Sequence, residues 1–105
     1  MLMINEANFN AEVKESSIPV IIDYYADWCG PCKMIAPVFE SLSKKMTDVK
    51  FAKLNVDENT QLAHDQGVLG IPCMIVYRGG EEVDRIVGYQ PEDQLKAKIE
   101  KALAK

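Results

Sequence analysis

The run from Ile18 to Tyr25, IPVIIDYY, constrains the fold more than any other segment of this chain. It is rich in β-branched and aromatic residues and almost continuously apolar, which predicts a central β-strand covered on both faces. Only Asp23 interrupts the apolar pattern. A strand of this kind belongs to a layered α/β fold, in which helices pack on both sides of a sheet.

Strand-like and helix-like segments alternate along the rest of the chain. Further strands are expected at residues 1–4, 49–56, 71–77 and 81–88, and helices over 5–16, from Cys32 to Met46, over 59–67 and from Pro91 onward. Gly79-Gly80 separates the last two strands by two residues, which predicts an antiparallel hairpin. The expected order is β-α-β-α-β-α-β-β-α, a mixed central β-sheet flanked by helices on both faces.

Length and charge narrow the class of protein. The chain has 105 residues with no internal repeat and no Gly/Ser-rich linker, so one domain over residues 1–105 is expected. Its net charge of −4 disfavours nucleic acid and anionic membranes as partners. The longest apolar run, Val68 to Tyr77, is too short to span a bilayer. The N-terminus lacks the basic leader of a secretory signal, so a cytoplasmic location is expected.

The segment Ala26 to Lys33, ADWCGPCK, carries two of the three cysteines. A metal site would need further ligands, and the only soft candidates are Cys73 and His64. A structural disulfide disagrees with the reducing cytosol. Both alternatives stay open, but redox exchange by Cys29 and Cys32 is favoured because the pair lies in a βαβ pattern.

The position of Cys29 suits disulfide exchange, in which the thiolate is the nucleophile. Cys29 lies directly before the predicted helix, whose positive end stabilises an anion and lowers the pKa of the thiol. Cys32 follows one turn along, and Pro31 restricts the backbone between the two. We expect Cys29 to be the more exposed and the more reactive thiol.

Several segments together resemble the thioredoxin family. These are WCGPCK, KLNVD at 53–57, GIPCMIVY at 70–77, the Gly79-Gly80 hairpin and VGYQPEDQL at 87–95, which match in order and spacing along nearly the whole chain. The resemblance implies a thioredoxin fold and a protein-disulfide reductase, a thiol–disulfide oxidoreductase that maintains cell redox homeostasis.

The resemblance also implies the cofactor, the partners and the roles of individual residues. No cofactor is expected beyond the redox-active disulfide Cys29–Cys32. The expected partners of this monomer are disulfide-containing substrate proteins and a thioredoxin reductase, either NADPH- and flavin-dependent or ferredoxin-linked. The implied catalytic residues are Cys29 for attack, Cys32 for resolution, and Asp23 with Lys53 for proton transfer. The implied substrate-binding residues are Trp28, Gly30, Pro31, Ile71, Gly88 and Pro72, the last as a cis-proline facing the cysteines.

The residues by themselves leave alternatives open at some of these positions. Asp23 could be an edge-strand carboxylate in water, and Lys53 could be an ordinary solvated side chain. His64 is expected to be exposed and receives no role. An oxidase or isomerase is the rival within the same chemistry, although Gly30-Pro31 is typical of reducing members. A binding module with incidental cysteines is the rival from another class.

The third cysteine departs from the family, which usually has threonine after the cis-proline. Side chains alternate along a strand, so Cys73 and Pro72 should point to opposite faces, and Cys73 should face away from the pair. We expect a buried, unreactive thiol there. The alternative is a third redox thiol exposed near the active site.

Overall fold

The structure, a computed structural model, describes residues 1–105 and contains a five-stranded sheet in the order β1-β3-β2-β4-β5. The strands are β1 (Leu2–Met3), β2 (Val20–Tyr25), β3 (Lys50–Asn55), β4 (Cys73–Arg78) and β5 (Glu81–Val87). The helices are η1 (Asn10–Lys14), α1 (Gly30–Lys45), α2 (Thr60–Asp65) and α3 (Glu92–Leu103). The predicted order of elements is confirmed, and the apolar run at Ile18 to Tyr25 supplies the central strand.

The sheet is mixed, as predicted. Strands β1 and β2 run parallel to β3, whereas β4 is antiparallel to both β2 and β5. Gly79 and Gly80 join β4 to β5 with φ angles of 62° and 82°. A two-residue turn of this type needs positive φ at both positions, which glycine adopts without steric cost.

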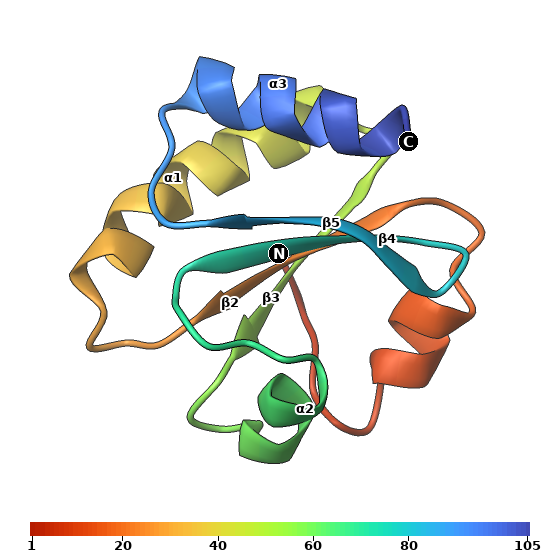
Figure 1. Cartoon of the computed structure of the whole chain (residues 1–105), viewed down its shortest axis with the longest axis vertical. Coiled ribbons are helices and arrows are strands. Elements are labelled where there is room, and N and C mark those ends of the chain that lie inside the picture. Colours follow the sequence, from red (N-terminus) through yellow and green to blue (C-terminus); the bar gives the residue numbers. More distant parts are fainter.

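Helices cover both faces of the sheet (Figure 1). Helices α1 and α3 pack on one side, which we call the α1/α3 face, and η1 and α2 pack on the other, the η1/α2 face. Side chains alternate along β2, so Ile21 joins the core under α1 and α3, while Ile22 and Tyr24 join the opposite core. Each core contains 13 buried residues, which explains why β2 is apolar on both sides.

The first and last helices differ in detail from the expectation. The first is π-helical, because the Glu15 N–H bonds to the Asn10 carbonyl oxygen, but Phe9 and Val13 are buried as the pattern predicted. In α3, Leu95 and Ile99 are fully buried, but the third buried residue of the row is Ala102. Leu103 is only partly buried. The helical repeat of 3.6 residues turns position 103 away from the row of Leu95 and Ile99. None of the helices combines the length and the apolar character needed to cross a bilayer.

Helix α2 ends in a pattern that fixes the next segment of chain. Gly67 has a φ of +69°, its N–H bonds to the His64 carbonyl oxygen, and the Val68 N–H bonds to the Ala63 carbonyl oxygen. These are the two hydrogen bonds of a Schellman motif. The predicted left-handed cap at Gly67 is confirmed, and it directs the chain from α2 toward β4.

Candidate active site

The candidate site lies where three connections meet at one end of the sheet: β2 to α1, α2 to β4, and β5 to α3 (Figure 1). The Cys29 N–H bonds to the Ala26 carbonyl oxygen at 3.2 Å. Cys29 Sγ lies 3.8 Å from the Ile71 carbonyl oxygen. The Gly88 N–H bonds to the Pro72 carbonyl oxygen at 2.8 Å. Segments far apart in the sequence are therefore fastened together around Cys29.

Cys29 and Cys32 form a disulfide whose Cα atoms are 5.2 Å apart, within the usual range for such bonds. Cys29 is the N-cap of α1, and its Sγ accepts a hydrogen bond of 3.3 Å from the Cys32 N–H. The helix starts at Gly30, two residues before the expected start, with Pro31 in its first turn. No group of three or more His, Cys, Asp or Glu side chains gathers as a metal site.

The expected difference in exposure between the two cysteines is wrong for this disulfide form. Cys29 is 5% exposed and Cys32 is 3% exposed, so both are buried. A residue between a strand and a helix is often exposed, but Cys29 is covered by other segments of the same chain. Ile71, Val56 and Tyr25 pack against the cysteine pair. The two sulfurs differ in their position relative to α1, because Cys29 is the N-cap and Cys32 lies within the first turn.

Asp23 is fully buried in β2, and neither of its carboxylate oxygens has a hydrogen-bond partner. The edge-strand alternative is wrong, because β2 is the middle strand of the sheet. The side chain lies on the α1/α3 face, since Ile21, two residues earlier, belongs to that core. Burial raises the pKa of Asp23 to about 6, although the nearby positive charge of Lys53 lowers it. An aspartate with the ordinary pKa of 3.8 would already be ionised at pH 6.

Lys53 pairs with Asp23 in the parallel register between β2 and β3. It is half-buried, which corrects the solvated alternative, and its Nζ lies 4.4 Å from the centre of the Tyr25 ring. The ammonium forms no ion pair with Asp23. Lys53 and Cys32 line a common hollow of about 150 Å³.

The peptide bond between Ile71 and Pro72 is cis, as the resemblance implied. Pro72 is buried, whereas Ile71 is only partly buried and packs against the two cysteines. The hydrogen bond from Gly88 holds the Pro72 carbonyl group. Ile71 and partly exposed Gly88 therefore form the surface at this wall of the site, with Pro72 behind them.

The remaining predicted contact residues lie at the surface beside the disulfide. Trp28 is 70% exposed, and Gly30 and Pro31 are exposed at the start of α1. The Trp28 Nε1–H donates to Asp57 Oδ2 at 2.9 Å. Asn55 holds the backbone of Asp57 in place for this contact, because its Oδ1 accepts a hydrogen bond from the Asp57 N–H at 2.9 Å. The indole ring is thus held in place although most of it faces water.

Three residues at the site went unassigned in the sequence analysis. Asp57 lies within the quoted KLNVD segment, but nothing local indicates that it bonds to a tryptophan 29 residues earlier. Leu69 and Val87 are exposed apolar residues; Leu69 lies two residues before the predicted contact Ile71, and Val87 lies directly before Gly88. Proximity in sequence to those predicted contacts was the available signal for both.

Cys73 faces away from the disulfide, as strand alternation predicted. It is a free, buried thiol in the core on the η1/α2 face, with Tyr24 and Ile75, whereas Cys29 and Cys32 form a separate cluster. Burial raises the pKa of the Cys73 thiol, which favours its protonated form.

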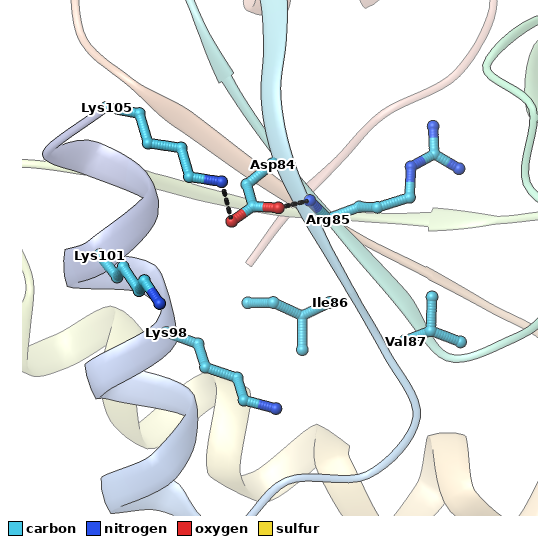
Figure 2. Close-up of a pocket in the computed structure, with 7 residues that line it drawn as sticks. All are labelled: Asp84, Arg85, Ile86, Val87, Lys98, Lys101 and Lys105. Atoms are coloured by element: carbon cyan, nitrogen blue, oxygen red, sulfur yellow. Dashed lines mark hydrogen bonds and ion pairs between the residues drawn. The ribbon is translucent and has the colours of Figure 1, made fainter.

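A second hollow, of about 300 Å³, lies between β5 and α3 (Figure 2). Its lining residues are Asp84, Arg85, Ile86, Val87, Lys98, Lys101 and Lys105. Lys105 Nζ donates to Asp84 Oδ2 at 3.0 Å across it, while the Arg85 side chain points away from the lysines. Neither cysteine of the disulfide lines this hollow, so it is separate from the redox pair.

Comparison with known proteins agrees with this geometry. A family model described as Thioredoxin matches residues 1–101. The chain is 42% identical to thioredoxin 1 of Synechococcus elongatus and 41% identical to the thioredoxin of Synechocystis sp., in both cases over 95% of this chain and 94% of the relative. It is 41% identical to the thioredoxin of Alicyclobacillus acidocaldarius over 93% of both chains. The chain therefore belongs to the thioredoxin family, and its Cys29–Cys32 pair makes it a thiol–disulfide oxidoreductase that exchanges disulfides with other proteins.

Proposed function

We propose that the protein reduces disulfides of cytoplasmic proteins in two steps, with Cys29 as the attacking residue and Cys32 as the resolving one. The observation that carries this order is the place of Cys29 as N-cap of α1, with its sulfur accepting the Cys32 N–H. A helix N-terminus stabilises an anion there, which favours the thiolate of Cys29. Cys32, one turn into the helix, lacks this position.

The two steps balance as follows. The Cys29 thiolate attacks one sulfur of a substrate disulfide, so a Cys29–substrate bond forms and the first substrate thiolate leaves. The Cys32 thiol then loses its proton and attacks Cys29 Sγ. The Cys29–Cys32 disulfide forms, the second substrate thiolate leaves, and two electrons have passed to the substrate.

Asp23 is the group that accepts the Cys32 proton in this proposal. Its support is a carboxylate that is buried, has no hydrogen-bond partner and has a pKa of about 6, close to the pH at which a general base works well. Lys53 assists by favouring the ionised form of Asp23. Further support is that Cys32 and Lys53 line a common hollow, so the lysine next to Asp23 also lies near the sulfur that loses its proton.

Substrates bind, in this proposal, across the surface formed by Trp28, Gly30, Pro31, Ile71, Pro72 and Gly88. The support is that these residues lie in the segments around Cys29 and that all except Pro72 are at least partly exposed. Trp28 is kept in position by Asp57, so its apolar surface is available without a large loss of conformational freedom on binding.

The wider setting of the reaction is also part of the proposal. Residues 1–105 act as a single, monomeric thioredoxin domain in the cytoplasm. A thioredoxin reductase returns the Cys29–Cys32 disulfide to the dithiol. That reductase draws its electrons either from NADPH through a flavin or from ferredoxin. Assays with each purified reductase separate these two sources.

A disulfide-reduction assay on insulin with single cysteine variants tests the order of steps. Cys29→Ser should show no reduction above the rate without protein, and Cys32→Ser should accumulate mixed disulfides that a denaturing gel resolves. Cys73→Ser is the matched control, because it makes the same change at a buried thiol on the other face. Trapping through Cys32 in the Cys29→Ser variant, with none in Cys32→Ser, would reverse the assigned roles.

Two further measurements address the rival functions, and a third tests which thiol is the more reactive. Equilibration of the pair against glutathione should leave it largely oxidised under conditions in which an oxidase would already be reduced. A binding module would keep its activity after loss of both thiols. A reductase would not, so we expect a double Cys29→Ser, Cys32→Ser variant to be inactive. Brief alkylation of the reduced protein should label Cys29 before Cys32.

A further inference from the structure

Leu69 presents an entire leucine side chain to water, since it is 100% exposed. Single exposed apolar residues are common and need no explanation by themselves. Leu69, however, lies two residues before Ile71, whose carbonyl oxygen is 3.8 Å from the sulfur of Cys29. Its exposure therefore occurs beside the reacting atoms.

The segment that carries Leu69 is fastened on both sides. Before it, the Val68 N–H bonds to the Ala63 carbonyl oxygen, and Arg85 donates to the carbonyl oxygens of Gln66 and Gly67 at 2.9 and 3.0 Å. After it, the Pro72 carbonyl oxygen accepts the Gly88 N–H. Val68 packs against the core of the η1/α2 face. Leu69 thus points outward from a fixed backbone, which limits the entropy lost when a partner covers it.

The chain segments beside Leu69 are apolar. A side chain added at Gly70 would meet the Val87 side chain at 3.6 Å, so the backbone next to Leu69 lies against Val87, which is 57% exposed. No Asp, Glu, Lys, Arg or His occurs from Gly67 to Tyr77 or from Ile86 to Gln90. The charged group beside this segment, the Arg85 guanidinium, is already paired with Glu82 and bonded to the Gln66 and Gly67 carbonyl oxygens. An apolar substrate side chain would therefore be covered by Leu69 and Val87 without leaving a new charge unpaired.

We propose that Leu69 is a specificity-determining residue that favours substrate disulfides flanked by an apolar side chain. This inference rests on the proposed attack by Cys29 and deepens it. Consecutive Cα atoms are about 3.8 Å apart, so the Cα of Leu69 lies within about 7.6 Å of the Cα of Ile71. An extended substrate chain bonded to Cys29 reaches Leu69 with the residue about two or three positions from its own cysteine.

Short peptides with one central cysteine test the proposal. The cysteine is joined in a mixed disulfide to 5-thio-2-nitrobenzoate, and a leucine is placed two or three positions before or after it in a Ser/Gly background. The Cys29 thiolate attacks the peptide sulfur, the Cys29–peptide bond forms, and the coloured thiolate leaves. Its absorbance gives the rate of the first step for each peptide, with a serine-only peptide as reference.

With wild-type protein, at least one leucine placement should react about tenfold faster than the serine peptide, since that is the effect of covering about half of a leucine side chain. Leu69→Ser should abolish this preference and leave the serine-peptide rate unchanged, while Leu69→Met should keep it. Ile18→Ser is the control, because Ile18 is 42% exposed before the opposite end of β2 and should leave every rate unchanged.

Equal wild-type rates for all peptides would overturn the proposal, as would a leucine preference that survives in Leu69→Ser. Failure of the proposed function has a different signature. In that case wild-type protein would release the coloured thiolate from the serine peptide no faster than Cys29→Ser does, and both inferences would fall together.

Discussion

On the η1/α2 face of the sheet, the buried hydroxyl groups of Tyr24 and Tyr77 lie 2.6 Å apart and bond to each other, whereas on the α1/α3 face the Asp23 carboxylate has no partner. Tyr77 also donates to Gln66 Oε1 at 3.0 Å. A buried polar group without a hydrogen bond costs about 1–3 kcal/mol, and more when it is charged. The η1/α2 face avoids this cost, whereas the α1/α3 face, which holds Asp23, retains it.

Cys73 and Asp23 extend the same comparison to ionisable groups. They lie on the adjacent strands β4 and β2 and face opposite sides of the sheet, and burial raises the pKa of both. Cys73 is enclosed by an apolar core without a reacting group. Asp23 lies on the side covered by α1, the helix that begins at the disulfide. A raised pKa therefore reports burial in both residues. The proposed proton transfer depends, in addition, on the position of Asp23 beneath the helix that carries the cysteines.

The largest effect is expected from Asp23→Asn, which replaces the unpaired carboxylate with a neutral group. The folded-state pKa of about 6 exceeds the ordinary value of 3.8, so the folded state binds the proton more tightly. Wild-type stability should fall as the pH rises from about 4 to about 6. The variant lacks this loss and should be about 3 kcal/mol more stable above pH 7, the free energy of a pKa shift from 3.8 to about 6, with no advantage below pH 4.

Denaturant melts of the disulfide form across this pH range measure the difference. Asp27→Asn is the control, because Asp27 is exposed and its loss should change stability by less than about 0.5 kcal/mol. A destabilised Asp23→Asn variant would mean that Asp23 is a paired structural residue, and the contrast between the two faces would disappear.

A smaller effect is expected on the other face from removal of one tyrosine hydroxyl. Tyr77→Phe leaves the Tyr24 hydroxyl buried without a partner, whereas Tyr24→Phe leaves Tyr77 still bonded to Gln66. Tyr77→Phe should cost about 1–3 kcal/mol and Tyr24→Phe about 1 kcal/mol. Thermal melts of both variants, with insulin reduction as a check on activity, measure this. Equal costs would show that the hydroxyls do not depend on each other.

The smallest effect is expected from Cys73→Ser on catalysis. Because Cys73 is buried on the face away from the disulfide, the insulin-reduction rate should stay within about twofold of wild type. Thiol counting on the folded, reduced protein should find Cys73 unlabelled until denaturant is added. Labelling of Cys73 as fast as Cys29 would place the third thiol in the redox chemistry.

Features set by neighbouring residues could be predicted from the sequence. The β-branched run around Val20, the Gly79-Gly80 turn and the helix start at the cysteines are local signals, and each led to the correct element. The cis bond at Pro72 came from the family resemblance, because local sequence gives only about 5% odds for it.

Features set by tertiary packing could not be predicted in the same way. Asp57 reaches Trp28 only because β3 and the loop before α1 end side by side. Leu69 is fully exposed although it belongs to an apolar run, and Cys29 is buried although it follows a loop. Burial depends on which segments fold over a residue, and a sequence pattern does not specify that.

The rate at which Cys32 resolves a mixed disulfide, followed across pH, tests the role of Asp23 most directly. Trp28 is the only tryptophan and adjoins Cys29, so stopped-flow fluorescence can follow the step in single turnovers. The wild-type rate should rise through an inflection near pH 6, the pKa of Asp23. Asp23→Asn should lack this inflection and react about a hundredfold more slowly at pH 7. Superimposable profiles for the two proteins would contradict proton transfer through Asp23.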